Sequence, residues 1–260
     1  MLGSIIGDIS GSSYEFRRNK DINVPLFPAE SDFTDDTIML VATAHALLRG
    51  GDFLTAYRQF GAQFPSPMGG YGASFRAWLI SSNPEPYGSW GNGSAMRVAP
   101  IGWAFESLED TLQWAAQSAA VTHNHPEGVK GACATAAAIW LARHGSSKEE
   151  IRHYVMQSFG YDLERTCDTI RPAYHFNESC QGTVPEAMIA FLDSTDFEHA
   201  IRLAISLGGD ADTLACITGG IAQAYYKKIP NYMIEKARNI LAPSLREVVD
   251  GFVNRFQIEY

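Results

Sequence analysis

The chain has 260 residues, of which 46% are hydrophobic, and it carries a formal net charge of −9. That length is sufficient for a large buried core, and the acidic balance argues against a protein that binds nucleic-acid phosphates over a basic surface. No linker rich in Pro, Gly or Ser and no run of charges marks a boundary. We therefore expect one domain over residues 1–260.

Helical periodicity is frequent along the chain, whereas alternating runs of β-branched residues are scarce. Ser107 precedes an acidic first turn, and Ser146 or Ser147 opens a capping box. In chain order we expect helices over residues 37–51, 107–123, 126–145, 146–160, 184–194, 196–209, 210–230 and 230–241. The predicted fold class is all-α, a compact bundle of many helices with a helix of small, apolar residues at 213–226 in its centre.

The chain shows no sign of export or membrane insertion. Asp8 interrupts the apolar run at the N-terminus, and no basic residue precedes it, which is not typical of a signal peptide. The longest apolar stretch, which begins at Ala132, is too short to cross a bilayer. The four cysteines include no C-x-x-C pair. We therefore expect a cytoplasmic protein without membrane contact.

Two adjacent carboxylates, Asp35 and Asp36, stand between Thr34 and Thr37 directly before an apolar helix. Such residues cap helices, and an acid in the first turn gains ~0.3–1 kcal/mol from the helix dipole. A cap needs only one side-chain oxygen, however, and burial of two neighbouring carboxylates without a cation is costly. The cluster is either a helix cap or half of a binding site.

A similar cluster, formed by Asp210, Asp212 and Thr213, opens a later helix. If the two helix starts meet, they assemble carboxylate and hydroxyl oxygens without any His or Cys. That donor set suits Mg²⁺, Mn²⁺ or Ca²⁺ rather than zinc. Two such ions roughly 3.5–4 Å apart would activate a water molecule or orient a substrate oxygen.

A glycine-rich segment covers residues 87–102 and contains Gly88, Gly91 and Gly93. Glycines let backbone amides converge on an anion. The segment lacks the third glycine of a dinucleotide fingerprint, and the chain has no Gly-Lys-Ser/Thr sequence. It is either an ordinary turn or a phosphate-binding loop.

Four further polar residues are candidates for structural or functional roles. His123 and His125 could bind a metal, but their place before Pro126 and the absence of a third ligand favour a structural role. Asp8 and Glu15 are typical of a helix cap and a surface acid. Beside a pair of metal ions, Glu15 would become a candidate acid or base.

In combination, these motifs resemble the ADP-ribosylglycohydrolase family, which includes dinitrogenase reductase-activating glycohydrolase and the ADP-ribosyl-acceptor hydrolases. The resemblance is carried, in order, by the segments GDISGSSYEF, FTDDTIML, GNGSAMRVAPIG, VTH and SLGGDADTLACITGGIAQAYY. It implies an all-α fold with a binuclear Mg²⁺ or Mn²⁺ centre.

The resemblance also implies roles for individual residues. The implied metal ligands are Thr34, Asp35, Asp36, Asp210, Asp212 and Thr213. The implied contacts to the diphosphate and the distal ribose are Gly88, Ser89, Trp90, Asn92 and Gly93. His123 would lie beside the substrate, and Gly182 would belong to an adenosine-side loop. Asp35 or Asp36 would position the water, and Glu15, on a mobile flap, would carry a proton.

The implied reaction is hydrolysis of the bond between ribose C1″ and an acceptor, through an oxocarbenium-like state. ADP-ribose would be released from a protein or a small molecule. Family base rates favour an arginine or guanidino linkage, while serine, nucleic-acid-base and O-acetyl linkages stay open. Where some arginine-specific relatives carry an acid, this chain has Gly88, Ser89 and Trp90. The alternatives are a binuclear-metal phosphoesterase and a non-enzymatic ADP-ribose-binding protein of the immunity type.

Overall fold

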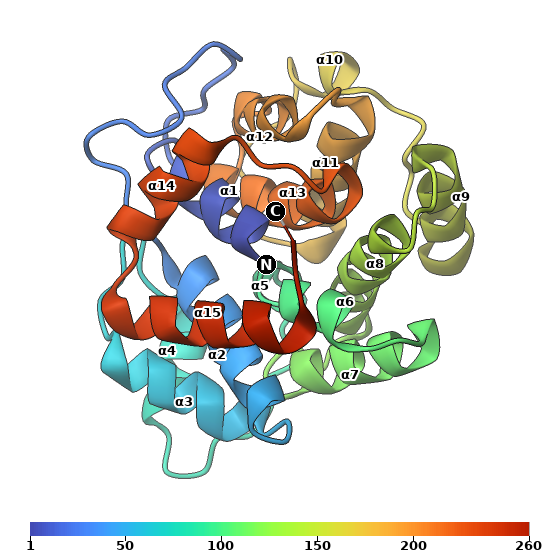
Figure 1. Cartoon of the computed structure of the whole chain (residues 1–260). Helices are drawn as coiled ribbons and strands as arrows, with labels where there is room; N and C mark the ends of the chain where they lie inside the picture. The colour runs from blue at the N-terminus through green and yellow to red at the C-terminus, as the bar shows by residue number, and fades with distance from the viewer. Residues whose placement is uncertain (260) are drawn as a thin grey trace.

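The structure, a computed structural model, describes residues 1–259 as helices joined by loops (Figure 1). Within that range no named strand forms, and two isolated β-bridges join Thr34 to Met68 and Gly91 to Ser179. The all-α prediction is confirmed. The helices are α1 Leu2–Ser12, α2 Asp35–Leu48, α3 Phe53–Gln63, α4 Ala73–Ile80, α5 Gly93–Met96, α6 Ala99–Ala104, α7 Leu108–Ala120, α8 Pro126–Arg143, α9 Lys148–Phe159, α10 Cys167–Ile170, α11 Cys180–Asp193, α12 Phe197–Ser206, α13 Ala211–Tyr226, α14 Asn231–Ile240 and α15 Pro243–Phe256.

Helices α1 and α13 pack against each other in the middle of the molecule (Figure 1). Every residue of α1 is buried, and α13 is buried from its first residue to Ala224. The close approach depends on Gly3, Gly7 and Gly11, which repeat every four residues along one face of α1. A methyl group on Gly7 would lie only 2.0 Å from the carbonyl oxygen of Ala215. The predicted central position of the small-residue helix is confirmed.

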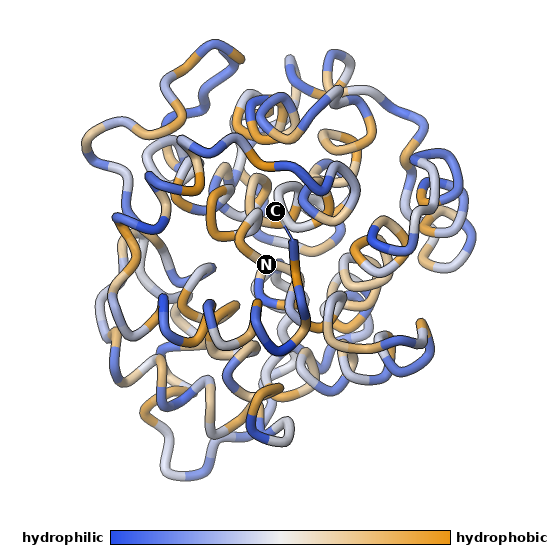
Figure 2. The backbone as a smooth tube through the Cα atoms, viewed as in Figure 1, coloured by the Kyte–Doolittle hydropathy of each residue, from blue (hydrophilic) through white to orange (hydrophobic). Residues whose placement is uncertain are grey.

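The remaining helices surround this pair. Helices α8, α11 and α12 pack on α13, while α2 lies between α3, α15 and α6. Figure 2 shows hydrophobic residues along α1 and a more hydrophilic α9 at the edge of the molecule. None of the helices within residues 1–259 combines the length and the hydropathy that a membrane crossing requires.

The capping signals place several helix starts correctly. The Ser107 side chain accepts a hydrogen bond from the Asp110 amide, and Ser147 forms the expected capping box with Glu150. The sequence did not predict α1, α3, α4 or α15. The helix expected at residues 184–194 begins earlier, at Cys180, because Ser179 caps it there, and Pro185 lies inside the helix. The single-domain organisation stays a prediction.

Candidate active site

The start of α2 is fixed by a carboxylate from α1. The fully buried Asp8 accepts hydrogen bonds from the Thr34 amide (3.0 Å), the Thr34 hydroxyl (2.8 Å) and the Thr37 amide (3.1 Å). The Thr34 hydroxyl oxygen in turn accepts from the Asp36 amide (3.1 Å). Thr34 therefore caps α2, which is one of the two interpretations that the sequence leaves open for the cluster. Asp8 satisfies two further amides at this helix start. Asp8 belongs to α1 but caps α2, so the residues next to it in the sequence did not reveal this contact.

The start of α13 lies beside the start of α2. The Thr213 hydroxyl donates to Asp36 Oδ1 (3.4 Å), and the Thr213 amide donates to Asp212 Oδ1 (2.9 Å). From the glycine-rich loop, the side-chain nitrogen Nδ2 of Asn92 donates to Asp210 Oδ2 (2.6 Å). The two acidic helix starts therefore meet, as a shared site requires, and Asn92 connects the glycine-rich loop to them.

The carboxylates lie close enough to share a cation. One carboxylate oxygen each of Glu15, Asp210 and Asp212 falls within 4.8 Å of the other two. Asp36 Oδ2 is buried and has no hydrogen-bond partner among the described residues. An orphaned carboxylate oxygen next to other acids fits a site for hard divalent cations such as Mg²⁺ or Mn²⁺.

Burial and mutual repulsion act on the ionisation of these acids. Burial raises the pKa of Asp35, Asp36 and Asp212 well above the ordinary value, and the neighbouring carboxylates raise it further. Burial also raises the pKa of Asp210 to about 6 and, together with nearby acids, that of Glu15 to about 8. A bound cation would reverse this effect, because it favours the ionised form.

Glu15 follows α1 and reaches over the cluster. The loop after α3 approaches its carboxylate closely, since a methyl group on Gly69 would lie 2.8 Å from Glu15 Oε2. Gly69 has a φ of +74°, a conformation that glycine adopts readily. The next residue, Phe16, stacks on Phe176 with ring centroids 5.8 Å apart. Glu15 is thus placed by contacts on both sides.

A cavity of about 400 Å³ contains this cluster and one face of the glycine-rich loop. The expected site residues in its wall are Glu15, Asp35, Asp36, Ser89, Asn92, Gly93, His123, Asp210, Asp212 and Thr213. Four expected residues are not in the wall: Thr34, Gly88, Trp90 and Gly182. Residues that line it without having been expected include Tyr87, Arg97, Phe176 and Glu178.

The glycine-rich loop uses several of its own amides for its conformation. The Gly88 amide donates to Asn124 Oδ1 (2.7 Å), the Gly91 amide to Ser89 Oγ (3.1 Å), and the Asn92 amide to the Glu178 carbonyl (2.7 Å). These three amides are therefore not free to bind a phosphate, so a phosphate-binding site could use only part of the loop. Gly93 faces the cavity beside His123 and remains a suitable contact.

The two histidines have different surroundings. His123 is buried, and its Nδ1 lies 2.7 Å from the Thr122 hydroxyl, so the ring is held in place at the cavity wall. His125 is the N-cap of α8, and its Nδ1 accepts from the Glu127 amide. The structural interpretation of His125 is confirmed. The exposed ring of Trp90 packs edge-on against His125, outside the cavity wall.

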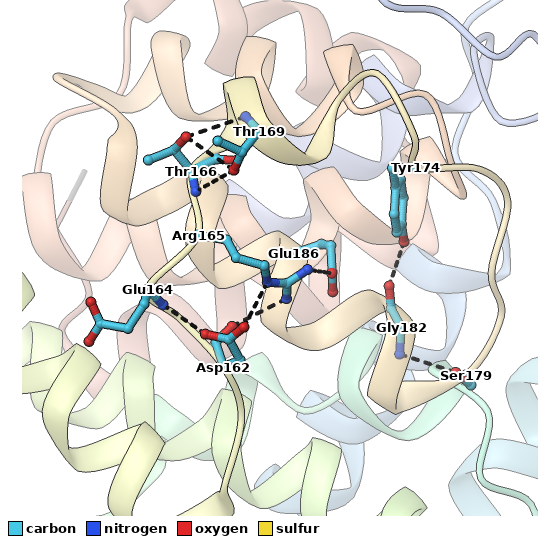
Figure 3. A network of polar contacts seen from close by, with 9 residues as sticks. All are labelled: Asp162, Glu164, Arg165, Thr166, Thr169, Tyr174, Ser179, Gly182 and Glu186. Atoms are coloured by element: carbon cyan, nitrogen blue, oxygen red, sulfur yellow. Dashed lines mark hydrogen bonds and ion pairs between the residues drawn. The ribbon is translucent and has the colours of Figure 1, made fainter.

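Gly182 lies in the first turn of α11, not in a loop (Figure 3). Its amide donates to Ser179 Oγ (3.1 Å), and its carbonyl accepts from the Tyr174 hydroxyl (2.6 Å). Glu186, one turn further, pairs with Arg165 at 2.8 Å. The segment around Gly182 is therefore the start of a helix capped by Ser179 and not a loop, and the adenosine-side role of Gly182 stays a prediction. Phe176 and Glu178, which precede this cap, reach the cavity.

The all-α fold and the cluster of acids in its cavity are what the resemblance to the ADP-ribosylglycohydrolase family implies. The family model for ADP-ribosylglycohydrolase matches residues 1–260. Human ADP-ribosylhydrolase ARH3 is 28% identical over 95% of this chain and 92% of its own length. The ADP-ribosylarginine hydrolase Tri1 of Pseudomonas putida is also 28% identical, over 91% of this chain and 72% of its own.

Solved structures agree with the sequence relatives. A chain described as an ADP-ribosylglycohydrolase-related protein complex superposes with a TM-score of 0.73 at 26% identity, and it covers 100% of this chain and 96% of its own. This chain therefore belongs to the ADP-ribosylglycohydrolase family. The prediction of an enzyme that hydrolyses ADP-ribosyl linkages is confirmed at the level of the family.

Proposed function

We propose that this protein uses divalent cations to cleave the bond between ribose C1″ and the acceptor of an ADP-ribosylated protein or small molecule, and that it releases ADP-ribose. The proposal depends above all on one observation. The acidic starts of α2 and α13 meet beside Glu15 in a cavity that the glycine-rich loop also lines. We propose an arginine or another guanidino group as the acceptor, since one relative is named an ADP-ribosylarginine hydrolase.

Two Mg²⁺ or Mn²⁺ ions would fit the oxygen atoms of this site. The residues that would hold them are Thr34, Asp35, Asp36, Asp210, Asp212 and Thr213. Among these, Thr34 already donates to Asp8, so its oxygen would bind through a remaining lone pair. Bound cations would supply Lewis acidity at the ribose hydroxyls and at a water molecule.

The residues of the chain itself would do the remaining work. Asp35 or Asp36 would orient the attacking water. Both line the cavity, and Asp36 Oδ2 has no hydrogen-bond partner among the described residues. Glu15 would accept or return a proton at its carboxyl group, because it faces the cavity beside Asp210 and Asp212. Ser89, Gly93 and His123 would orient the diphosphate and the distal ribose.

The test is turnover of a panel of ADP-ribosylated substrates with Mg²⁺ or Mn²⁺. We expect ADP-ribose to be released from an arginine conjugate, and activity to vanish in Asp36→Ala and after treatment with EDTA. Release of AMP from the same conjugates, or of inorganic phosphate from a phosphomonoester, would instead identify a phosphoesterase. Tight ADP-ribose binding without turnover would identify a binding protein. Full activity of Asp36→Ala would contradict the proposed role of the cluster. Cytoplasmic location stays a prediction.

A further inference from the structure

Glu15 lies on a loop, residues 13–34, that is attached to the rest of the molecule at points beyond this carboxylate. The loop joins α1 to α2 and runs at the edge of the molecule (Figure 1). Arg202 of α12 donates from Nη1 to the Ile22 carbonyl (3.2 Å) and to the Val24 carbonyl (2.9 Å). The middle of the loop is therefore bound to a helix.

Lys20, which is closer to Glu15 in the sequence, attaches the same loop to two other segments. Its Nζ donates to the Tyr174 carbonyl (2.7 Å) and to the Leu207 carbonyl. Both acceptors belong to residues that are held in place. The Tyr174 phenol donates to the Gly182 carbonyl in α11 at 2.6 Å (Figure 3), and Leu207 is the C-cap of α12. Lys20 therefore connects the loop to fixed parts of the fold.

The backbone of the loop lies directly on the turn that precedes the acids of α13. A methyl group on Gly208 would lie only 2.3 Å from the Asn19 carbonyl oxygen and 3.0 Å from the Arg18 carbonyl carbon. Arg18 has a φ of +46°, which residues other than glycine rarely adopt, so its neighbours must hold it there. Asp210, two residues after Gly208, has a carboxylate oxygen within 4.8 Å of one of Glu15. One turn therefore contacts the loop and also leads into the acidic cluster.

We infer that Lys20 is a positioning residue, which keeps the Glu15 carboxylate beside the acids at the start of α13 by attaching its loop to the turn before that helix. No hydrogen bond or ion pair within residues 1–259 holds this carboxylate directly. The neighbouring acids repel it when they are ionised. The approach of Gly69 and the stacking of Phe16, which is 71% exposed, are van der Waals contacts that do not attach it to those acids. The position of Glu15 therefore depends on the attachments of its loop.

The first experiment is hydrogen exchange of backbone amides, measured by mass spectrometry on the protein without substrate. The amides of Tyr14 and Arg17 report on the loop, because they donate to the carbonyls of Gly11 (2.8 Å) and Tyr14 (3.0 Å). We expect these amides to be protected in the wild type and to exchange about tenfold faster in Lys20→Met, with α13 unchanged. Unprotected amides in the wild type would overturn the inference, even if no variant could be purified.

Two further variants are the controls for this exchange measurement. Lys20→Arg can still donate to both carbonyls, so its loop should exchange as that of the wild type does. Lys228→Met makes the same change at an exposed lysine that has no hydrogen bond or ion pair within residues 1–259, and it should leave the loop unchanged. If Lys20→Met exchanged no faster than Lys228→Met, Lys20 would not hold the loop.

The second experiment tests whether Lys20 acts through Glu15, and it rests on the proposed function. We expect Lys20→Met to lower kcat for an ADP-ribosylarginine conjugate on the order of tenfold with little change in KM, because a displaced carboxyl group transfers a proton poorly. In the Glu15→Gln background the same substitution should have little further effect. An equal loss in both backgrounds would contradict action through Glu15. If the wild type releases no ADP-ribose from any conjugate while Lys20→Met loosens the loop, the proposed function fails and the attachment by Lys20 stands.

Discussion

The same substitution, Gly→Ala, is expected to have opposite effects at two helix positions. In a helix interior it stabilises by about 1 kcal/mol through backbone propensity. At Gly251, in α15, the added methyl group would lie 3.8 Å from Leu48 Cδ1, an ordinary contact, so the gain remains. At Gly7 the methyl group would lie 2.0 Å from the oxygen and 2.3 Å from the carbon of the Ala215 carbonyl. These Ala215 atoms belong to the backbone of α13, so they cannot rotate away from the methyl group as a side chain could.

The magnitude follows from the distances. Carbon and carbonyl oxygen atoms approach to about 3.3 Å, so α1 and α13 would have to separate by roughly 1.3 Å. Overpacking of this kind costs about 1–3 kcal/mol, occasionally more. A clash between backbone atoms reaches the upper end of this range, so about 2 kcal/mol is lost after the propensity gain of about 1 kcal/mol. Since 1 kcal/mol moves the Tm of a chain of this size by about 2–4 °C, we expect Gly7→Ala to lower the Tm by roughly 4–8 °C.

Thermal melts followed by circular dichroism measure both variants under the same conditions. Gly251→Ala is the matched control, and its Tm should rise by about 2–4 °C. If Gly7→Ala were also more stable than the wild type, the close contact between α1 and α13 would not be present in solution. A loss of stability in both variants would instead point to an unrelated defect.

Three further results are expected. Asp8→Ala leaves the amides of Thr34 and Thr37 without an acceptor at about 1–3 kcal/mol each, so urea denaturation should show a loss of about 2–6 kcal/mol; a loss below 1 kcal/mol would contradict the contact. Folding raises the pKa of Glu15 from 4.5 to about 8, so the folded protein binds its proton more tightly than the unfolded chain does. The cation-free protein should therefore lose stability as pH rises between these two values. A Tm independent of pH would contradict this. Mg²⁺ at 100 times its Kd should add about 2.7 kcal/mol to the free energy of unfolding at pH 8. The gain should be smaller at pH 5, where more of the acids are protonated, and melts with and without EDTA measure it.

Local signals in the sequence were sufficient for several helix starts and for the acidic clusters. Ser107 and Ser147 act through residues three positions away, so their hydrogen bonds depend on the local sequence alone. The same holds for Thr34, whose oxygen caps the helix that follows it. Composition also identified α13, because a helix that is apolar on all sides must be buried.

Contacts between distant segments account for what the sequence did not reveal. Helix α1 has no side-chain cap and contains three glycines, so its helical conformation depends on packing against α13. Asp8 satisfies amides that lie 26 and 29 positions further along the chain. Arg97 appeared only as one residue within the segment GNGSAMRVAPIG, and its contact with Thr122 is 25 positions away. No local pattern carries that information.

The contact between α1 and α13 also sets the spacing of the acids. Asp8 follows Gly7 and fixes the start of α2, while Asp212 follows Ala211, whose carbonyl faces Gly11. Separation of the two helices would therefore move the acids of α2 away from those of α13. Mg²⁺ requires ligands at about 2.0–2.1 Å in near-ideal geometry, whereas Ca²⁺ accepts 2.3–2.6 Å and a variable number of oxygens. Gly7→Ala should consequently weaken Mg²⁺ binding more than Ca²⁺ binding, because the helix contact determines the size of the site as well as the stability of the fold.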